Sequence, residues 1–420
     1  MALIDDLIND IKNKQSVFIT GAAGVGKTTI LLQLYDILKE KLKLKIVLTS
    51  TIGMNAINLG GITIHRFSGI NTQTDIDYIK TIKESSNFKS LASRIKKVNI
   101  IAIDEISMLR ADQFNLIDLI FREVTKKDIP FGGKTLILTG DFYQLPPVTK
   151  NFESLKDQWV FNSKSWQNMN IKTYELSKVK RQEEIKFINF LNKMRIGEIE
   201  DDITVQQIIN QCSSRKILDN DTIFFSRKDE CDNYNNYKLS KIQNKQHNYE
   251  AIVYSRWGVE QENAIMKECI ARKTLSLKKG ASVITIINDP DKRFYNGSKA
   301  IITKLQKDKI TIKLNDTNKE IVLTPYVWSK KNAKGVELAR MIQFPIILAY
   351  ALTIHKSQGM TLDTAVVDCK NIFTYGQIYV AISRVKKLEN LTIINFDPSK
   401  VICSNEVKKF YKKSKIIYID

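Results

Sequence analysis

A glycine-rich run near the N-terminus has the spacing of a phosphate-binding loop. It fits the pattern G-x-x-x-x-G-K-[ST], with an apolar strand-like run before it and helical spacing after it. Glycines let backbone N–H groups face phosphates, and the N-terminus of the following helix adds a favourable field. We expect Lys27 to neutralise β- and γ-phosphate charge and Thr28 to bind Mg²⁺. The predicted nucleotide-binding residues are Gly21, Ala22, Ala23, Gly24, Val25, Gly26, Lys27, Thr28 and Thr29.

Two acidic residues, Asp104 and Glu105, end an apolar segment at 98–103. If this segment is a strand of a parallel sheet, both carboxylates emerge at the edge where such sheets bind ligands. Asp104 then suits a role in holding Mg²⁺, and Glu105 suits the general base that orients and deprotonates water. The pair favours hydrolysis over a simple kinase reaction. The alternative is two solvated acids at the end of a strand.

A stiff turn follows another strand candidate at 135–139. Residues 140–147 read GDFYQLPP, and the two prolines fix the backbone around Asp141 and Gln144. We expect Gln144 to sense the γ-phosphate and to pass its presence to a neighbouring surface. A rigid surface turn without this role is the alternative.

Two arginines are candidates for contact with the transferred phosphoryl group. Arg384 ends a helix-like segment at 376–383, and Arg181 follows the run at 176–180. Either could act as an arginine finger that stabilises developing charge. A structural salt bridge is the alternative for each.

The chain contains three histidines, and two lie in short polar runs. His65 is part of TIHRF at 63–67, and His355 is part of TIHKSQG at 353–359. Polar donors beside an aromatic suit single-strand binding through backbone contacts and base stacking. A structural role is the usual alternative for a lone histidine, and we place His247 on the surface. The predicted DNA contacts are Thr51, His65, Phe67, His355, Lys356 and Gln358, and Gly359 is predicted to contact the nucleotide.

Composition fits a globular protein that attracts polyanions. The 420 residues include 65 Lys and Arg against 45 Asp and Glu, which gives a formal net charge of +20. Such a balance favours salt-sensitive binding of nucleic acid. A solvated basic surface is the alternative, because the richness in Ile, Lys and Asn suggests an AT-rich genome.

Nothing in the sequence addresses the protein to a compartment. Five cysteines are scattered without a C-x-x-C pair, which argues against zinc and favours free thiols inside a cell. No apolar run reaches membrane length, and the acidic N-terminus is wrong for a signal peptide. We expect a soluble intracellular protein, with nucleus, viral replication site and bacterial cytoplasm not distinguished.

The order of strand-like and helix-like segments predicts two α/β domains. Residues 1–180 form the first, a P-loop domain with a polar insertion at 65–97. Residues 181–420 form the second. Within it, the apolar period changes to two between about 281 and 345, which predicts a small inserted β module. The Lys-rich tail at 408–415 is expected to be a solvated helix face, with a nuclear signal as the alternative.

Taken together, these motifs resemble the superfamily-one DNA helicases of the petite-integration-frequency type, relatives of the RecD-like branch. The resemblance covers nearly the whole chain. It rests on the P-loop and on the runs at 48–56, 63–67, 103–109, 139–148, 179–182, 279–283, 296–297, 348–363 and 376–384.

This resemblance implies two RecA-like domains, 1A and 2A, with ATP and Mg²⁺ as cofactors. It implies that 65–97 is a short wedge, 1B, and that 281–345 is a Src-homology-three-like barrel, 2B. Family members move 5′ to 3′ along single-stranded DNA. The resemblance therefore implies a monomeric motor that acts on tailed or forked duplexes in replication, repair or recombination, with replication proteins as partners.

Two departures from the family pattern stand out. A glutamine that reads adenine usually lies about seventeen residues before the first P-loop glycine, but here that place falls near Ile4, and Gln15 is too close to the strand. Either the chain starts late or base recognition is loose, so we predict a relaxed nucleotide preference. The chain also looks like a helicase core alone, which leaves recruitment to partners.

Three rival functions remain at this point. A DNA remodeller could use ATP as a switch without separating strands, although Glu105 and Arg384 are both present. An RNA helicase would present the same phosphates and stackable bases to the channel. A P-loop kinase or GTPase is disfavoured by the second α/β domain and by Arg384.

Overall fold

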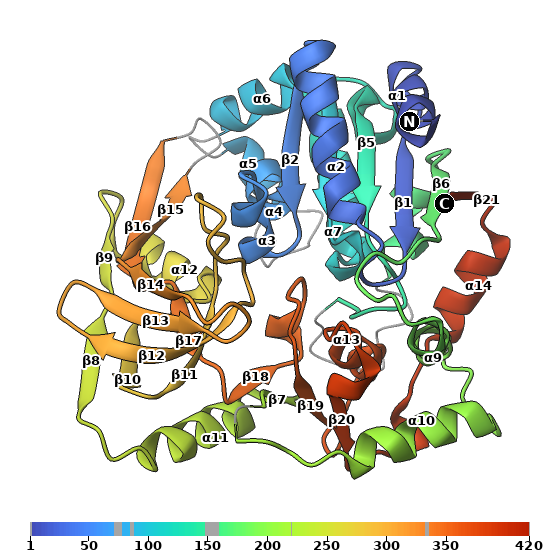
Figure 1. Cartoon of the computed structure of the whole chain (residues 1–420). Helices are drawn as coiled ribbons and strands as arrows, with labels where there is room; N and C mark the ends of the chain where they lie inside the picture. The colour runs from blue at the N-terminus through green and yellow to red at the C-terminus, as the bar shows by residue number, and fades with distance from the viewer. Residues whose placement is uncertain are drawn as a thin grey trace. The chain divides into compact units, whose positions relative to one another are not determined.

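Two α/β units make up the chain (Figure 1). The first comprises Met1–Arg181 and Cys403–Asp420, and the second comprises Gln182–Ile402. The computed structural model describes residues 2–70, 78–84, 88–147, 159–219, 221–331 and 336–419. Each unit contains a parallel sheet with helices, which confirms the predicted α/β class.

The sheet of the first unit has the strand order β21-β6-β1-β5-β4-β2-β3, and all neighbours are parallel. The central strands β1, β5 and β4 are buried along their whole length. Such burial agrees with their apolar runs, because a parallel sheet is covered on both faces. The strands are β1 (Val17–Gly21), β2 (Ile46–Ser50), β3 (Ile62–Thr63), β4 (Ile100–Asp104), β5 (Thr135–Thr139), β6 (Lys172–Leu176) and β21 (Ile416–Ile419).

Helix α2 carries the phosphate-binding residues and lies on this sheet (Figure 1). Its apolar residues Ile30, Leu31 and Leu34 are buried with the core strands. Lys27 is its first residue, and a π-helical segment at Ile37–Lys41 continues it. The helices around this core are α1 (Ala2–Lys12), α2 (Lys27–Asp36), α3 (Gly53–Asn58), α7 (Ala111–Thr125) and α8 (Lys164–Gln167).

The expected insertion at 65–97 is helical where the structure describes it. It contains α4 (Ile64–Ser68), α5 (Tyr78–Glu84) and α6 (Phe88–Lys97), while 71–77 and 85–87 lie outside the described residues. Arg94 of α6 donates from Nε to Phe67 O at 2.7 Å and from Nη2 to Arg66 O at 2.9 Å. This arginine therefore holds the C-terminal end of α4.

The C-terminal segment belongs to the first unit, which corrects the expected boundary of a second domain at 181–420. Strand β21 adds to the sheet beside β6, with Ile416 opposite Thr173 and Ile419 opposite Leu176 (Figure 1). Helix α14 (Asn405–Lys413) turns Phe410 toward an aromatic cluster, with its ring 4.4 Å from that of Phe161. The lysines at 408–415 led us to predict a solvated helix from the sequence, although Val407 and Tyr411 on one face of α14 are buried.

A parallel sheet also forms the centre of the second unit, with the order β18-β7-β19-β20. Its strands are β7 (Ile223–Phe225), β18 (Ala351–Thr353), β19 (Ala365–Asp368) and β20 (Leu391–Ile394). Its helices are α9 (Ile185–Ile196), α10 (Ile203–Ser214), α11 (Lys228–Ser240) and α13 (Gln377–Ile382).

Antiparallel strands interrupt this second α/β pattern over a longer stretch than the expected 281–345. They begin at Gln246 and end at Leu348, where β17 pairs with β11. The orders are β14-β13-β12-β11-β17, β15-β16-β9 and β10-β8. Residues 332–335 of the expected segment lie outside the described residues.

Polar alternation in β8 and the shortness of β9 hide the earlier strands of this segment from a sequence pattern. Helix α12 (Val259–Glu268) lies among them. The strands are β8 (Gln246–Glu250), β9 (Ile252–Tyr254), β10 (Thr274–Lys278), β11 (Ser282–Thr285), β12 (Lys299–Leu305), β13 (Ile310–Leu314), β14 (Glu320–Leu323), β15 (Tyr326–Lys331), β16 (Glu337–Gln343) and β17 (Ile346–Leu348).

Within the described part of the chain, no helix is both long enough and apolar enough to cross a membrane.

Candidate nucleotide site and its neighbouring groups

Three adjacent strands bring the predicted nucleotide motifs to one edge of the first sheet. Strand β1 leads into the P-loop, β4 ends at Asp104, and β5 leads into the turn at 140–147. Because these strands are parallel neighbours in the order β1-β5-β4, their carboxyl ends lie together. This edge is where ligands bind in sheets of this kind.

The P-loop is held by contacts that require its glycines. Gly21 has φ of 137°, and a Cβ atom there would lie 2.6 Å from Leu176 O, so a larger residue would clash with the backbone of β6. The Lys27 ammonium donates to Gly21 O at 2.8 Å and to Ala22 O at 3.0 Å. The lysine therefore lies over the loop, at the start of α2, where phosphate groups would be met.

Asp104 is buried between two hydroxyl donors. Thr28 donates to its Oδ2 at 3.3 Å, and Thr139 donates to its Oδ1 at 2.6 Å. Burial raises the pKa of Asp104, while the hydroxyl of Thr139 and the charge of Lys27 act in the opposite direction. The sequence did not single out Thr139, because its role depends on β5 lying beside β4.

The donor set fits a magnesium ion. The hydroxyl of Thr28 and the carboxylate of Asp104 are hard oxygen ligands that lie side by side at the phosphate-binding edge. Among the described residues, no cluster of three or more His, Cys, Asp or Glu side chains could hold a metal. Mg²⁺ commonly takes one or two protein ligands and completes its shell with water and substrate phosphates, so the pair Thr28 and Asp104 suits it.

Glu105 follows in a strained backbone conformation, with φ of 56°. Its neighbour Thr51 holds this corner from the next strand. The N–H of Thr51 donates to Asp104 O at 3.2 Å, and its hydroxyl donates to Glu105 O at 2.7 Å. A residue predicted to contact DNA is thus tied directly to the backbone of the predicted general base.

The turn that carries Gln144 is closed by Asp141. Gln144 donates from Nε2 to Asp141 Oδ2 at 3.1 Å, and Tyr143 donates from its backbone N–H to Oδ1 at 3.1 Å. Tyr411 of α14 stacks on Tyr143 with ring centroids 4.8 Å apart. Its hydroxyl accepts from the N–H of Phe142 at 3.2 Å and lies 2.7 Å from the hydroxyl of Thr20.

No sequence pattern pointed to Tyr411, because it lies far along the chain among lysines. The structure places it between the end of β1 and the turn that carries Gln144.

The two predicted arginine fingers lie in different units. Lys180 donates from its backbone N–H to Gly24 O at 3.0 Å, so Arg181 follows directly after a contact with the P-loop. Arg384 donates from Nε to Val380 O at 2.7 Å and from Nη2 to Ser383 Oγ at 2.8 Å. Its guanidinium is therefore anchored at the end of α13, and both finger roles stay predictions.

The two residues of α4 that were predicted to contact DNA differ in burial. Phe67 is 3% exposed, and its ring lies 6.1 Å from that of Phe121, so it belongs to the core and its predicted base stacking is corrected. His65 is partly buried. Burial chiefly lowers its pKa, nearby Arg110 adds to this, and a hydrogen bond with Gln113 opposes it.

The remaining predicted contacts lie in the second unit, after β18. His355 and Lys356 occupy a 3-10 turn at His355–Ser357, which is followed by Gln358 and by Gly359 with φ of 80°. The pKa of His355 is lowered by burial, and its ring stacks at 6.4 Å on that of Phe373. These side chains come together within the second unit as expected, but their ligands stay predictions.

Known proteins resemble this chain along nearly its whole length. The PIF1-like helicase family matches residues 2–204. ATP-dependent DNA helicase PIF1 of Xenopus laevis is 33% identical over 96% of this chain, which spans 63% of that relative. ATP-dependent DNA helicase Pif1 of Campylobacter jejuni is 32% identical, with 99% of this chain and 98% of the relative aligned.

The fold agrees with the same relatives. The crystal structure of Bacteroides sp Pif1 in complex with ADP-AlF4 has a TM-score of 0.83 and 32% identity, and the alignment covers 97% of this chain and 95% of that one. The nucleotide edge described above is thus found in a chain similar throughout to these proteins. The chain belongs to the PIF1-like helicase family, a family of ATP-dependent DNA helicases.

Proposed function

We propose that this chain is an ATP-driven motor that moves 5′ to 3′ along single-stranded DNA and separates duplex DNA ahead of it. One observation carries the proposal. A complete set of hydrolytic groups, Lys27, Thr28, Asp104 and Glu105, meets at one sheet edge in a chain that matches Pif1 helicases almost end to end.

The first unit supplies the groups for hydrolysis. Lys27 neutralises phosphate charge, and Thr28 and Asp104 hold Mg²⁺, which supplies further charge neutralisation when bound. Glu105 orients the attacking water and accepts its proton. Arg181 and Arg384 stabilise charge on the transferred phosphoryl group, and this part rests on the family resemblance.

We propose that ATP hydrolysis is coupled to DNA binding through two hydrogen-bonded residues, Gln144 and Thr51. Gln144 is held by Asp141 in the turn beside the nucleotide edge, which suits a sensor of the γ-phosphate. Thr51 is bonded to the backbone of Glu105, which suits a link from the strand path to the general base. His65, His355, Lys356 and Gln358 complete the proposed DNA contacts, and Gly359 the nucleotide contacts.

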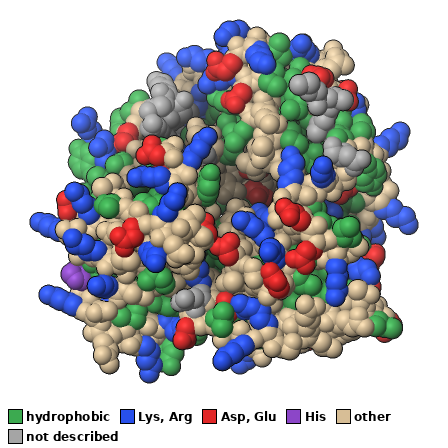
Figure 2. Space-filling view, viewed as in Figure 1, with side chains coloured by type: hydrophobic (Ala, Val, Ile, Leu, Met, Phe, Trp, Pro, Cys, Tyr) green, Lys and Arg blue, Asp and Glu red, His purple; other side chains and the backbone are tan. Residues whose placement is uncertain are grey.

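The positive charge of the chain supports a polyanionic substrate but does not locate its path. Lys and Arg side chains are scattered over the visible face instead of gathering in one place (Figure 2). The strand path is therefore proposed from individual residues. As the family implies, 65–97 is the wedge, the antiparallel segment is a Src-homology-three-like barrel, and a monomer serves replication, repair or recombination with replication proteins as partners.

Base recognition is proposed to be loose. Gln15 lies before β1, at the opposite end of this strand from the P-loop, and its amide donates to Ser16 O at 3.1 Å and to Asn170 O. The length of β1 therefore separates Gln15 from the P-loop. Without a specific contact to the base, GTP and CTP should each be hydrolysed at no less than about a tenth of the rate of ATP. Negligible turnover of both would contradict this.

Polarity tests the motor itself. Matched duplexes with either a 5′ or a 3′ single-stranded DNA tail are incubated with ATP and Mg²⁺, and strand separation is measured. Lys27→Ala is the control, because it removes the phosphate-neutralising charge. Unwinding from the 5′ tail alone is expected. Unwinding from the 3′ tail would overturn the polarity, and ATPase without unwinding on either tail would favour a remodeller.

A further inference from the structure

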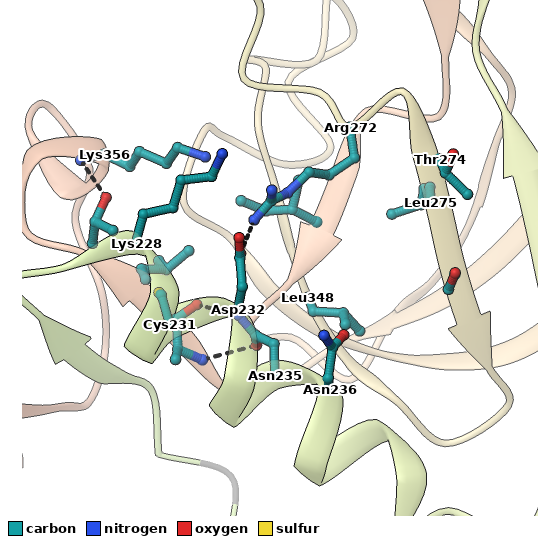
Figure 3. A pocket seen from close by; sticks show the side chains of 15 residues that line it. Lys228, Cys231, Asp232, Asn235, Asn236, Arg272, Thr274, Leu275, Leu348 and Lys356 are labelled. Carbon is teal, nitrogen blue, oxygen red and sulfur yellow. Dashed lines mark hydrogen bonds and ion pairs between the residues drawn. The ribbon is translucent and has the colours of Figure 1, made fainter.

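A pocket in the second unit gathers basic side chains from separate parts of the chain. It has a volume of about 240 Å³ and lies where α11, β10 and β18 meet. Lys228 comes from the first residue of α11, Arg272 from just before β10, and Lys356 from the turn after β18. Figure 3 shows all three side chains reaching toward the same space.

Two of these cations, Lys228 and Lys356, form no ion pair with a described residue. Among the residues that the structure describes, neither the Lys228 nor the Lys356 ammonium has a hydrogen-bond or ion-pair partner. The pKa of Lys356 is lowered, first by burial and then by nearby Arg272; Asp232 opposes this shift, and Lys228 adds to it. Like charges that face a cavity in this way are relieved by an anion.

The third cation is neutralised by Asp232, the single carboxylate among the described residues of the pocket lining. Asp232 forms an ion pair with Arg272, and their side chains are 33% and 38% exposed. It lies one helical turn after Lys228, on the same face of α11. The pocket therefore contains both an arginine and the carboxylate that forms an ion pair with this arginine.

The helix that carries two of these groups is anchored to the neighbouring strand. Asn235 of α11 donates from Nδ2 to Ala351 O at 2.8 Å, and its Oδ1 accepts from Ala351 N–H at 3.0 Å. This pair of hydrogen bonds anchors α11 to β18. The backbone positions of Lys228 and Asp232 are thereby held opposite β18, and the exposed Lys228 side chain is free to turn toward a ligand.

We propose that this pocket binds one backbone phosphate of single-stranded DNA through Lys228, Lys356 and Arg272, and that Asp232 competes with this phosphate for Arg272. The proposal rests on the proposed function and adds a subsite and a brake to it. Leu275 and Leu348 give the pocket an apolar wall that can accept a sugar but cannot read a base. Competition by Asp232 weakens the grip, so the strand can leave at each step.

The role of the cations is tested by replacing them one at a time and measuring the affinity of each variant for DNA. The full chain is titrated, without ATP, into a labelled oligothymidylate at several salt concentrations, and fluorescence anisotropy gives Kd. Lys228→Ala and Arg272→Ala should each weaken binding about threefold to tenfold and reduce the slope of log Kd against log salt by about 0.7. Lys245→Ala removes an exposed lysine of the same unit and should change neither value beyond about twofold.

The proposed competition by Asp232 predicts tighter DNA binding when its carboxylate is removed, a change that a loss of folding cannot produce. Asp232→Asn keeps the shape of the side chain and releases Arg272, so affinity should rise about threefold or more. Asp229→Asn is the matched control, because it removes the same charge from an exposed position of the same helix. Unchanged or weaker binding by Asp232→Asn, or equal gains in both variants, would overturn the competition.

Two further results separate the sources of phosphate and the two proposals. Inorganic phosphate, titrated at constant ionic strength, should displace the oligothymidylate no better from the wild-type chain than from Lys228→Ala. Selective displacement from the wild type at low millimolar phosphate would assign the pocket to free phosphate. Pocket variants that match the Lys245→Ala control would overturn the pocket alone, whereas a wild-type chain that binds no DNA would overturn the proposed function.

Discussion

Glu105 combines a reactive carboxylate with a strained backbone. Its φ of 56° places the side chain differently from an ordinary strand end, and Thr51 holds this conformation from β2. A fixed carboxylate suits a general base, because proton abstraction depends on position before it depends on pKa. Strain at such a corner is maintained only where surrounding contacts determine it.

The role of Glu105 is tested by Glu105→Gln, which keeps the shape but cannot accept a proton. We expect the DNA-stimulated kcat to fall about 100-fold or more while ATP binding persists. Turnover is followed by phosphate release, and binding by a fluorescent ATP analogue. Glu40→Gln, at an exposed position, is the control and should leave both unchanged. A normal kcat in Glu105→Gln would remove this residue from the role of base.

Lys299 is a charge that the second unit buries at a cost. It is 8% exposed, and its ammonium has no hydrogen-bond acceptor among the described residues. Burial lowers its pKa to about 8, although Asp221 and Asp363 oppose the shift. Below that pH the folded chain must hold the charged form, which water solvates better in the unfolded chain.

Lys299→Met should therefore raise the free energy of unfolding at pH 7 by roughly 1 to 3 kcal/mol. Between about pH 8 and 10.5 the unfolded wild-type chain binds more protons than the folded chain, so its stability rises with pH. The advantage of the variant should thus shrink over that window. Urea denaturation of both proteins from pH 7 to pH 9.5 measures it, and an advantage independent of pH would contradict the explanation.

At the scale of elements, the sequence predicted what is local and missed what is remote. The strands of the nucleotide edge were identifiable because apolar runs and a glycine pattern lie within a few residues of one another. The contact of α14 with the turn at 140–147 was not, because Tyr411 and Phe142 are far apart in the chain. Phe67 misled the prediction, because an aromatic residue in a polar run can equally face the core.

Helix α14 braces the nucleotide edge chiefly through Tyr411. Tyr411→Phe keeps the ring that stacks on Tyr143 but leaves the N–H of Phe142 and the hydroxyl of Thr20 without this partner. The free energy of unfolding should fall by about 1 to 2 kcal/mol, as expected for lost buried hydrogen bonds. Chemical denaturation measures it, with Tyr418→Phe as control because that residue is 70% exposed. Equal losses in the two variants would contradict the brace.

At the scale of the whole molecule, the family and the nucleotide chemistry were predictable, whereas the division of the chain was not. The motifs follow one another in order along the sequence, but β21 and α14 return to the first unit after the second is complete. Hydrophobic periodicity describes neighbours in sequence, so it could not show which sheet a short final strand would join.

Removing Cys403–Asp420 should consequently damage the first unit more than the second. A chain that ends at Ile402 leaves the edge of β6 and the aromatic cluster uncovered. We expect loss of ATP binding and faster proteolysis within 1–181, while the second unit stays protected. Limited proteolysis with mass spectrometry locates the cleavage sites. Cleavage confined to the second unit would contradict the assignment of the final segment.

The same return of the chain has a consequence during translation. The first unit leaves the ribosome early, yet its last strand and its bracing helix are made only after the whole second unit. At about 5 to 20 residues per second, the intervening unit takes roughly ten seconds or more to synthesise. Throughout that interval the nascent chain exposes an unpaired strand edge and an aromatic surface, which makes it a natural client for chaperones. ATPase competence should therefore arise only after β21 has been synthesised and has left the ribosome.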